Sequence, residues 1–196
     1  MKTMTIGLDL AKNVFQVHGL NEADHIILRR KLRRAEVVTY FRSLPAAIVG
    51  IEACGGAHFW ARELSKLGHE VRLMPPAYVK PYVKRGKTDA IDAEAICEAM
   101  MRPTMRFVAP KTEDQQASCV ELKVRQLLVQ QRTRCVNALR GHLAEFGIVA
   151  GKGMGKVSDL IAVVHNADDG RLRSVAREAL QDLAPVSYTH LRCRRQ

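Results

Sequence analysis

The chain has 196 residues, 47% of them hydrophobic and 26% charged, which is the composition of an ordinary soluble globular protein with one substantial domain and an appendage. Lysine and arginine number 31 against 20 for aspartate and glutamate, and the resulting net charge of +11 predicts a nucleic-acid partner. No run of eighteen apolar residues is present and the N-terminus reads as a strand, so we expect a cytoplasmic protein that contacts no membrane.

Three strands are predicted at the start of the chain. The segments "TMTIGLDLA" (3–11), "NVFQVHGL" (13–20) and "HIILRRKL" (25–32) are rich in β-branched and apolar residues and are separated by short polar connections. Strands that follow one another so closely form an antiparallel meander.

Helices and strands then alternate. Apolar residues spaced by three and four predict helices over 34–44 and 57–68, and "AAIVGIEA" (46–53) is a continuous apolar run typical of a strand buried on both faces. A strand over 69–76 and helical segments over 76–85 and 88–102 follow. The order β-β-β-α-β-α-β-α predicts an α/β protein with a mixed five-stranded sheet and flanking helices, as in the ribonuclease-H-like fold.

Four carboxylates are candidate metal ligands. Asp9 lies in the first strand and Glu52 in the most apolar strand, so their side chains meet if those strands are neighbours. Asp89 and Asp92 are three residues apart and project from one side of a helix. Carboxylate oxygens suit hard cations such as Mg²⁺, and two such ions, about 3.5–4 Å apart, stabilise a phosphodiester displacement.

Each carboxylate also has a structural interpretation. Asp9 fits a turn at a strand end, and the helical aspartates fit a helix N-terminus. Glu52 is harder to explain in this way, because a carboxylate amid apolar neighbours is unfavourable unless it is paired or bound to metal. The five cysteines contain no C-x-x-C pair and the histidines have no ligand spacing, so neither a zinc ribbon nor a disulfide framework fits.

Two basic segments are candidate phosphate contacts. They are "RRKLRR" (29–34) and "KPYVKRGK" (80–87). Lysine and arginine clustered in this way attract a nucleic-acid backbone without reading its sequence. The predicted nucleic-acid-binding residues are Arg30, Lys31, Arg33, Lys84, Arg85 and Lys87.

The stretches "IGLDLAKNVFQVHGL" and "VGIEACGGAHFWARELSKLGHEVRLMPPAYVKPYVKRGKTDAIDAEAI", with the helix after them, resemble the N-terminal part of the DEDD transposases of one large bacterial insertion-sequence family. The resemblance covers about residues 1–184. It implies a RuvC-like domain over 1–110, DNA as the substrate and a structured guide, the bridge RNA. It also implies that the catalytic tetrad is Asp9, Glu52, Asp89 and Asp92, holding Mg²⁺ or Mn²⁺.

A long helix is predicted over about 113–146, inside a segment 111–150 that links the first domain to a short helical segment, 151–184. Its apolar stripe fits packing on its own domain as well as it fits an intermolecular coil. The resemblance favours the coil, and with it a homo-oligomer.

The last residues, "PVSYTHLRCRRQ" (185–196), show no helical period, and the preceding helix is expected to end before them. We interpret them as a tail outside the family sequence, in a chain truncated before the serine-bearing domain of its relatives. The expected function is therefore a transposase fragment that binds nucleic acid and metal but is incapable of full strand exchange. The alternatives are a stand-alone metal-dependent nuclease of resolvase type and a non-catalytic nucleic-acid-binding module.

Overall fold

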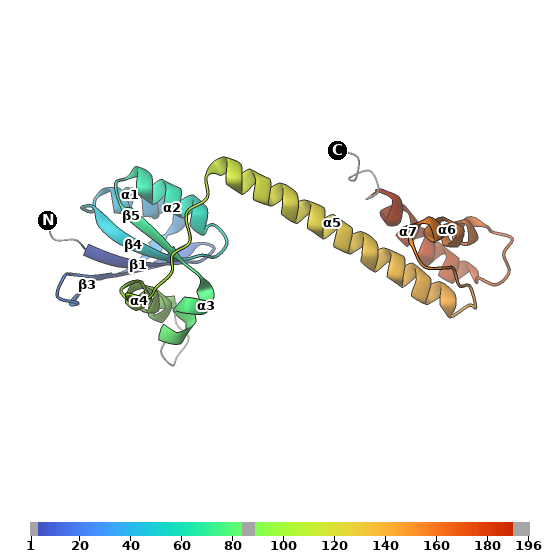
Figure 1. The fold of residues 1–196 in the computed structure, drawn as a ribbon, viewed down its shortest axis with the longest axis horizontal. Coiled ribbons are helices and arrows are strands. Elements are labelled where there is room, and N and C mark those ends of the chain that lie inside the picture. Colours follow the sequence, from blue (N-terminus) through green and yellow to red (C-terminus); the bar gives the residue numbers. More distant parts are fainter. Residues whose placement is uncertain (1–3, 84–88, 190–196) are drawn as a thin grey trace. The chain divides into compact units, whose positions relative to one another are not determined.

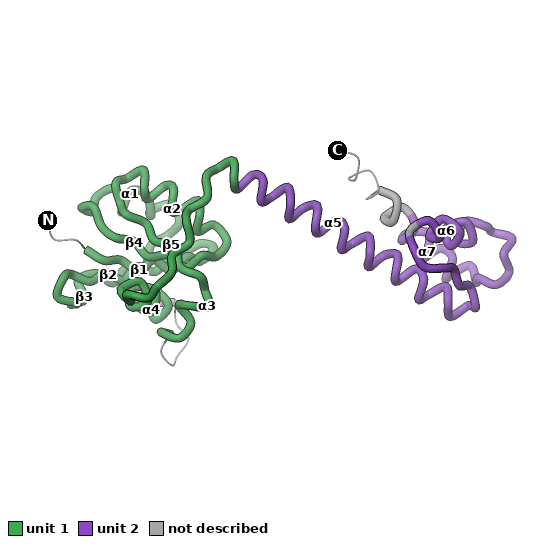
Figure 2. The backbone as a smooth tube through the Cα atoms, viewed as in Figure 1, with its two compact units in different colours: residues 1–115 green, residues 116–196 purple. Residues whose placement is uncertain are grey.

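The computed structural model describes residues 4–83 and 89–189, without the side chains of residues 89, 90, 154 and 185–189. The chain divides into two compact units, residues 1–115 and residues 116–196 (Figure 2). None of the helices within the described ranges is long and apolar enough to cross a membrane.

The first unit is built on a five-stranded sheet with the strand order β3-β2-β1-β4-β5 (Figure 1). Strands β1 (Met4–Leu10), β2 (Val14–Leu20) and β3 (Ile26–Arg33) form the predicted antiparallel meander. Strand β4 (Ala47–Glu52) pairs parallel with β1, and β5 (Glu70–Met74) pairs parallel with β4. The predicted mixed sheet of the ribonuclease-H-like fold is confirmed.

Helices cover both faces of this sheet. The 3₁₀ turn η1 (Arg34–Glu36) and helices α1 (Val37–Arg42) and α2 (Ala57–Lys66) lie on one face, and α4 (Asp89–Met100) lies on the other (Figure 1). The core under α1 and α2 includes Phe15 and Trp60, whose rings meet edge to face with centroids 5.0 Å apart. The alternation along β2 explains the division: Phe15 and Val17 face this core, and the alternating residues Gln16 and His18 face α4.

The helical segment predicted over 76–85 is two short pieces, α3 (Pro76–Val79) and η2 (Lys80–Tyr82). Pro81 has no N–H to continue the helical hydrogen bonds, so the backbone tightens into a 3₁₀ turn at this point.

The second unit contains most of α5 (Glu113–Ala144), η3 (Met154–Lys156), α6 (Val157–His165) and α7 (Ser174–Thr189). Its core packs the C-terminal part of α5, including Leu139 and Leu143, against apolar residues of α6 and α7. Because α7 runs on to Thr189, the predicted helix end before Pro185 is wrong. A proline removes one hydrogen bond near the end of a helix that eleven preceding residues have already established.

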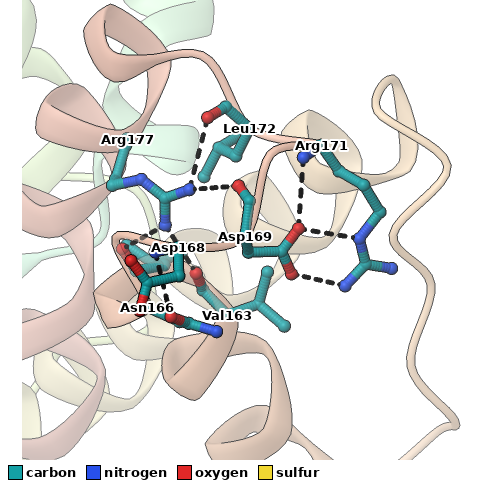
Figure 3. A network of polar contacts seen from close by, with 8 residues as sticks. Val163, Asn166, Asp168, Asp169, Arg171, Leu172 and Arg177 are labelled. Atoms are coloured by element: carbon teal, nitrogen blue, oxygen red, sulfur yellow. Dashed lines mark hydrogen bonds and ion pairs between the residues drawn. The ribbon is translucent and has the colours of Figure 1, made fainter.

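A buried arginine stabilises the loop between α6 and α7 through hydrogen bonds to main-chain oxygens (Figure 3). Arg177 is 8% exposed, and its guanidinium donates hydrogen bonds to the main-chain oxygens of four residues. The acceptors are Val163 (2.8 Å), Val164 (3.1 Å), Asp169 (2.6 Å) and Leu172 (3.2 Å). These carbonyls lie at the end of α6 and in the following loop, where the regular helical pattern of N–H donors ends.

Candidate active site

Two of the predicted carboxylates lie at the ends of adjacent parallel strands. Leu8 of β1 is in register with Ile51 of β4, so Asp9 and Glu52 are the next residues on their strands. Paired residues of neighbouring strands point to the same face of a sheet. Asp9 and Glu52, both half-buried, therefore share the face that α4 covers, as the sequence predicts for neighbouring strands.

Two glycines allow α4 to lie directly against these strands. A Cβ atom on Gly7 would lie 2.8 Å from the backbone nitrogen of Cys97 and closer still to the carbonyl oxygen of Ala93. On β4, a Cβ atom on Gly50 would lie 2.7 Å from the sulfur of Met100. At Gly7 the backbone of α4 therefore packs directly on the backbone of β1, whereas at Gly50 the space is filled by the Met100 side chain of α4. The helix that carries Asp92 lies close against both strands as a result.

The charge of Asp92 affects the strand carboxylates electrostatically. The pKa of Glu52 is raised, first by burial and then by the charge of Asp92. The pKa of the neighbouring Cys54 thiol is also raised, by burial first, then by Glu52 and more weakly by Asp9, against a lowering backbone hydrogen bond. Negative charge is thus concentrated at one end of the sheet, where a bound cation would relieve the repulsion.

The donor set fits a hard divalent cation. Carboxylate oxygens are the ligands that Mg²⁺ and Mn²⁺ prefer, whereas Cys54 is held in its protonated form, which is a poor ligand. Within the described part of the chain, no three His, Cys, Asp or Glu side chains gather closely enough to form a metal site. Asp89 belongs to α4, but its side chain lies outside the described residues, so the four-carboxylate ligand set stays a prediction.

The predicted nucleic-acid contacts fall into three groups. Lys84, Arg85 and Lys87 lie outside the described residues. The guanidinium of Arg30 lies over the ring of Tyr40, 5.0 Å from its centroid, on the face of the sheet that carries α1. Lys31 and Arg33 alternate with Arg30 along β3 and belong to the opposite face, which is the face of the carboxylates.

Two residues near the site were not singled out from the sequence. Gln16 of β2 is in register with Asp9 on one side and with Lys31 on the other. Arg29 lies in the predicted basic segment and shares the face of Lys31, because the two are separated by one residue on a strand. The period of two along β3 was the available signal for Arg29, whereas the position of Gln16 depends on the strand register.

Comparison with known proteins gives one family. Residues 6–148 match the sequence profile of the IS110 family of DEDD proteins, described as "Transposase". A Sinorhizobium fredii protein named as transposase y4pF/y4sB is 51% identical over 188 residues, covering 96% of this chain and 48% of the relative. A protein of Pseudomonas aeruginosa named as a family 20 transposase is 50% identical over 184 residues, covering 93% of this chain and 54% of the relative.

A transposase for the insertion sequence element IS1328, from Yersinia enterocolitica, is 44% identical over 158 residues, covering 81% of this chain and 47% of the relative. The chain thus spans about half the length of the curated relatives it matches. The profile match includes most of β1 with Asp9, and all of β4, α4 and α5. The chain belongs to the IS110 family of DEDD transposases.

Proposed function

We propose that the first unit is the metal-dependent, phosphodiester-cleaving part of a transposase, with Asp9, Glu52, Asp89 and Asp92 as the ligands of Mg²⁺ or Mn²⁺. The observation that carries this proposal is the placement of Asp9 and Glu52 at the ends of adjacent strands, with Asp92 close enough to raise the pKa of Glu52. Such a concentration of carboxylates is unfavourable in a protein that leaves them without a cation.

The protein's own residues position the reacting groups. Strands β1 and β4 fix the separation of Asp9 and Glu52, and α4 holds Asp92 against them through the contacts at Gly7 and Gly50. A bound divalent cation would polarise the phosphodiester and stabilise the charge that develops on its oxygens. The rigidity of the strands keeps the carboxylates in place without reorganisation during the reaction.

We further propose that the substrate is DNA and that a guide RNA accompanies it, as the family resemblance implies. The net charge of +11 supports a polyanionic partner. Lys31 and Arg33 support a contact on the carboxylate face of β3, and Lys84, Arg85 and Lys87 precede the helix that carries Asp92. Such contacts position a backbone and give no base preference.

The long helix is proposed to join copies of the chain. Its N-terminal part exposes apolar side chains that are between 41% and 65% accessible, namely Val120, Leu122, Val124, Leu127 and Val129. Spacings of three and four place Val120, Val124 and Leu127 on one face of α5, and an exposed apolar face of this kind is typical of a surface that a second helix covers. A homo-oligomer through α5 would bury this face.

The test of the metal-dependent activity is nicking of a plasmid that carries an end of the insertion element, with and without Mg²⁺ and guide RNA. We expect Mg²⁺-dependent nicks that Asp9→Asn and Glu52→Gln reduce at least about 100-fold, since each removes a charged ligand. Glu98→Gln is the matched control, because Glu98 is a carboxylate on the same helix that pairs with Arg102 at 2.6 Å. The proposal would be contradicted if both ligand variants nicked the plasmid as the unchanged chain does, or if nicking continued after the metal was chelated.

A further inference from the structure

A polar groove lies between the edge strand β3 and helix α4. It has a volume of about 350 Å³, with Gln16 and His18 of β2 in its floor, Arg29 and Lys31 on one side, and Ile91 and Glu94 on the other. Ile91 immediately precedes Asp92, so the groove begins beside the candidate metal ligands. A molecule bound in this groove could therefore extend to the carboxylates.

The strand register connects the groove to the carboxylates in a single row. Asp9 is opposite Gln16, and Gln16 is opposite Lys31. Two residues farther along, in the next row on the same face, Gly7 is opposite His18, and His18 is opposite Arg29. Both rows face α4, so an extended molecule that lies across Gln16 has the acidic centre at one end and two cations at the other.

The cations of this groove are accessible. The Arg29 side chain is 63% exposed, and its ion pair with Glu94 spans 3.8 Å. An exposed pair of this length is weak, and a guanidinium has five N–H donors, so the contact leaves Arg29 able to bind a phosphate. Lys31 is exposed on the same strand, about 7 Å farther along, which is two residues of strand rise.

Positive charge on β3 has a second explanation, because charged side chains on an edge strand prevent other strands from pairing with it. That explanation applies equally to cations on both faces of β3. Arg29, Arg30 and Lys31 all line the groove, but the guanidinium of Arg30 lies over the ring of Tyr40 on the opposite face of the sheet. By the alternation of side chains along β3, Arg29 and Lys31 share the face of the groove and Arg30 does not. The two explanations therefore predict different effects for neighbouring arginines.

We propose that the groove between β3 and α4 binds the sugar–phosphate backbone of the strand that is cleaved, beside the reacting phosphate. Arg29 and Lys31 neutralise two of its phosphates, and Gln16, which is uncharged, separates them from Asp9. This inference rests on the proposed cleavage activity for the identity of the strand. Binding to the groove itself requires no metal and can be measured without cleavage.

The experiment measures the affinity of the full chain for a short fluorescent single-stranded DNA in EDTA, at salt concentrations from 0.1 to 1 M. For a single strand, each neutralised phosphate contributes about 0.7 to the slope of log affinity against log salt, so Arg29→Ala with Lys31→Ala should lower that slope by about 1.4. Over one decade of salt this slope corresponds to a binding loss of about 25-fold at 0.1 M, which disappears near 1 M.

Arg30→Ala is the comparison variant, because it removes the same charge from the same strand on the opposite face. We expect it to change the affinity by less than about threefold, less than the loss of one neutralised phosphate. An equal effect of Arg30→Ala and Arg29→Ala would overturn the proposal, since it would show that net charge alone decides the affinity. Thermal unfolding of each variant separates a loss of binding from a loss of folding.

A variant expected to gain binding tests the groove in the opposite direction, and its thermal unfolding shows that it is folded. Glu94→Gln removes the anion that lines the groove and frees Arg29, so we expect DNA binding to tighten about fivefold at 0.1 M by the same salt relation. Unchanged or weaker binding by this variant would contradict the groove. An RNA strand of the same sequence completes the test: an equal dependence on Arg29 and Lys31 supports backbone binding, whereas dependence with RNA alone would overturn the assignment to the cleaved strand.

Discussion

Replacing Gly7 by alanine tests whether backbone packing of α4 builds the candidate active site. Gly7 does not have a positive φ, so alanine meets no conformational strain on β1. Its Cβ atom would, however, lie 2.8 Å from the Cys97 nitrogen and closer still to the Ala93 oxygen. Both are backbone atoms of α4, so no side chain can rotate away and the helix itself must move.

The size of the effect follows from these contacts. Ordinary contact begins at 3.4 Å, so the distance to the Cys97 nitrogen must grow by 0.6 Å (3.4 − 2.8), and the distance to the Ala93 oxygen by more. Forcing a methyl group into such a contact costs about 3 kcal/mol, at the upper end for overpacked sites. A displacement of about 1 Å at a reacting centre reduces catalysis by about 100-fold, so metal-dependent nicking should fall by that factor.

Gly50→Ala is the matched control on the neighbouring strand. The atoms that its Cβ would meet belong to the flexible ends of Met100 and Met74, at 2.7 and 3.2 Å, and these side chains can adjust. We expect a change in stability below about 1 kcal/mol, partly offset by the lower chain entropy of alanine in the unfolded state.

The assay is urea unfolding followed by the fluorescence of Trp60. This residue is the only tryptophan of the chain and lies 4% exposed in the core of the first unit, so its signal reports on that unit alone. The reasoning is refuted if Gly7→Ala is as stable and as active as Gly50→Ala. If the Gly7 variant were destabilised but kept full nicking activity, the packing of α4 on β1 would not be what positions Asp92.

Two further predictions concern the second unit. Arg177→Lys should weaken the protection of α6 and α7 amides against hydrogen exchange by about 3 kcal/mol, because an ammonium group has three donors and cannot reach all four carbonyls in Figure 3. Arg173→Lys, at an exposed position, should leave the protection unchanged, and equal behaviour of the two variants would contradict this role of Arg177. Hydrogen bonds from the Arg171 side chain chiefly lower the pKa of Asp169 from 3.8 to about 2. The folded state therefore binds fewer protons than the unfolded state between these values, so the stabilising effect of Asp169 is complete above pH 3.8 and is lost as the pH falls through 2. Urea unfolding of the second unit from pH 5 to pH 2 should show this loss in the native chain and a smaller one in Asp169→Asn.

Local pattern was enough to predict the sheet and the long helix. Short strands with short connections predicted the meander, and the helix predicted over about 113–146 is α5, Glu113–Ala144. Glu52 could be recognised as unusual because burying a carboxylate in an apolar strand is unfavourable unless it is paired or bound to a cation. These features depend on residues close to one another in the chain. They can therefore be predicted without knowing the tertiary contacts.

Features that depend on distant residues could not be predicted in the same way. The sequence predicts the basic segment of β3 as one cluster, yet the pleat directs Arg30 toward Tyr40 and its neighbours Arg29 and Lys31 toward the face of α4. The close approach of α4 at Gly7 depends on which helix covers which strand, and the row from Asp9 through Gln16 depends on register. At Pro185 local reasoning predicted a helix end, whereas the established helix α7 continues through it.

The register also explains how acidic and basic groups can serve one site without cancelling each other. Asp9 and Lys31 are separated by the intervening strand β2, hence by two strand spacings, or about 10 Å. A cation on β2 at the position of Gln16 would lie directly opposite Asp9, about 5 Å away, and would pair with it. That pairing would occupy the carboxylate and the cation together, leaving one unable to bind metal and the other unable to bind phosphate. In the proposed site, a neutral Gln16 therefore places no cation directly opposite Asp9, whereas Lys31, two strands away, would still be near enough to attract a phosphate beside the metal.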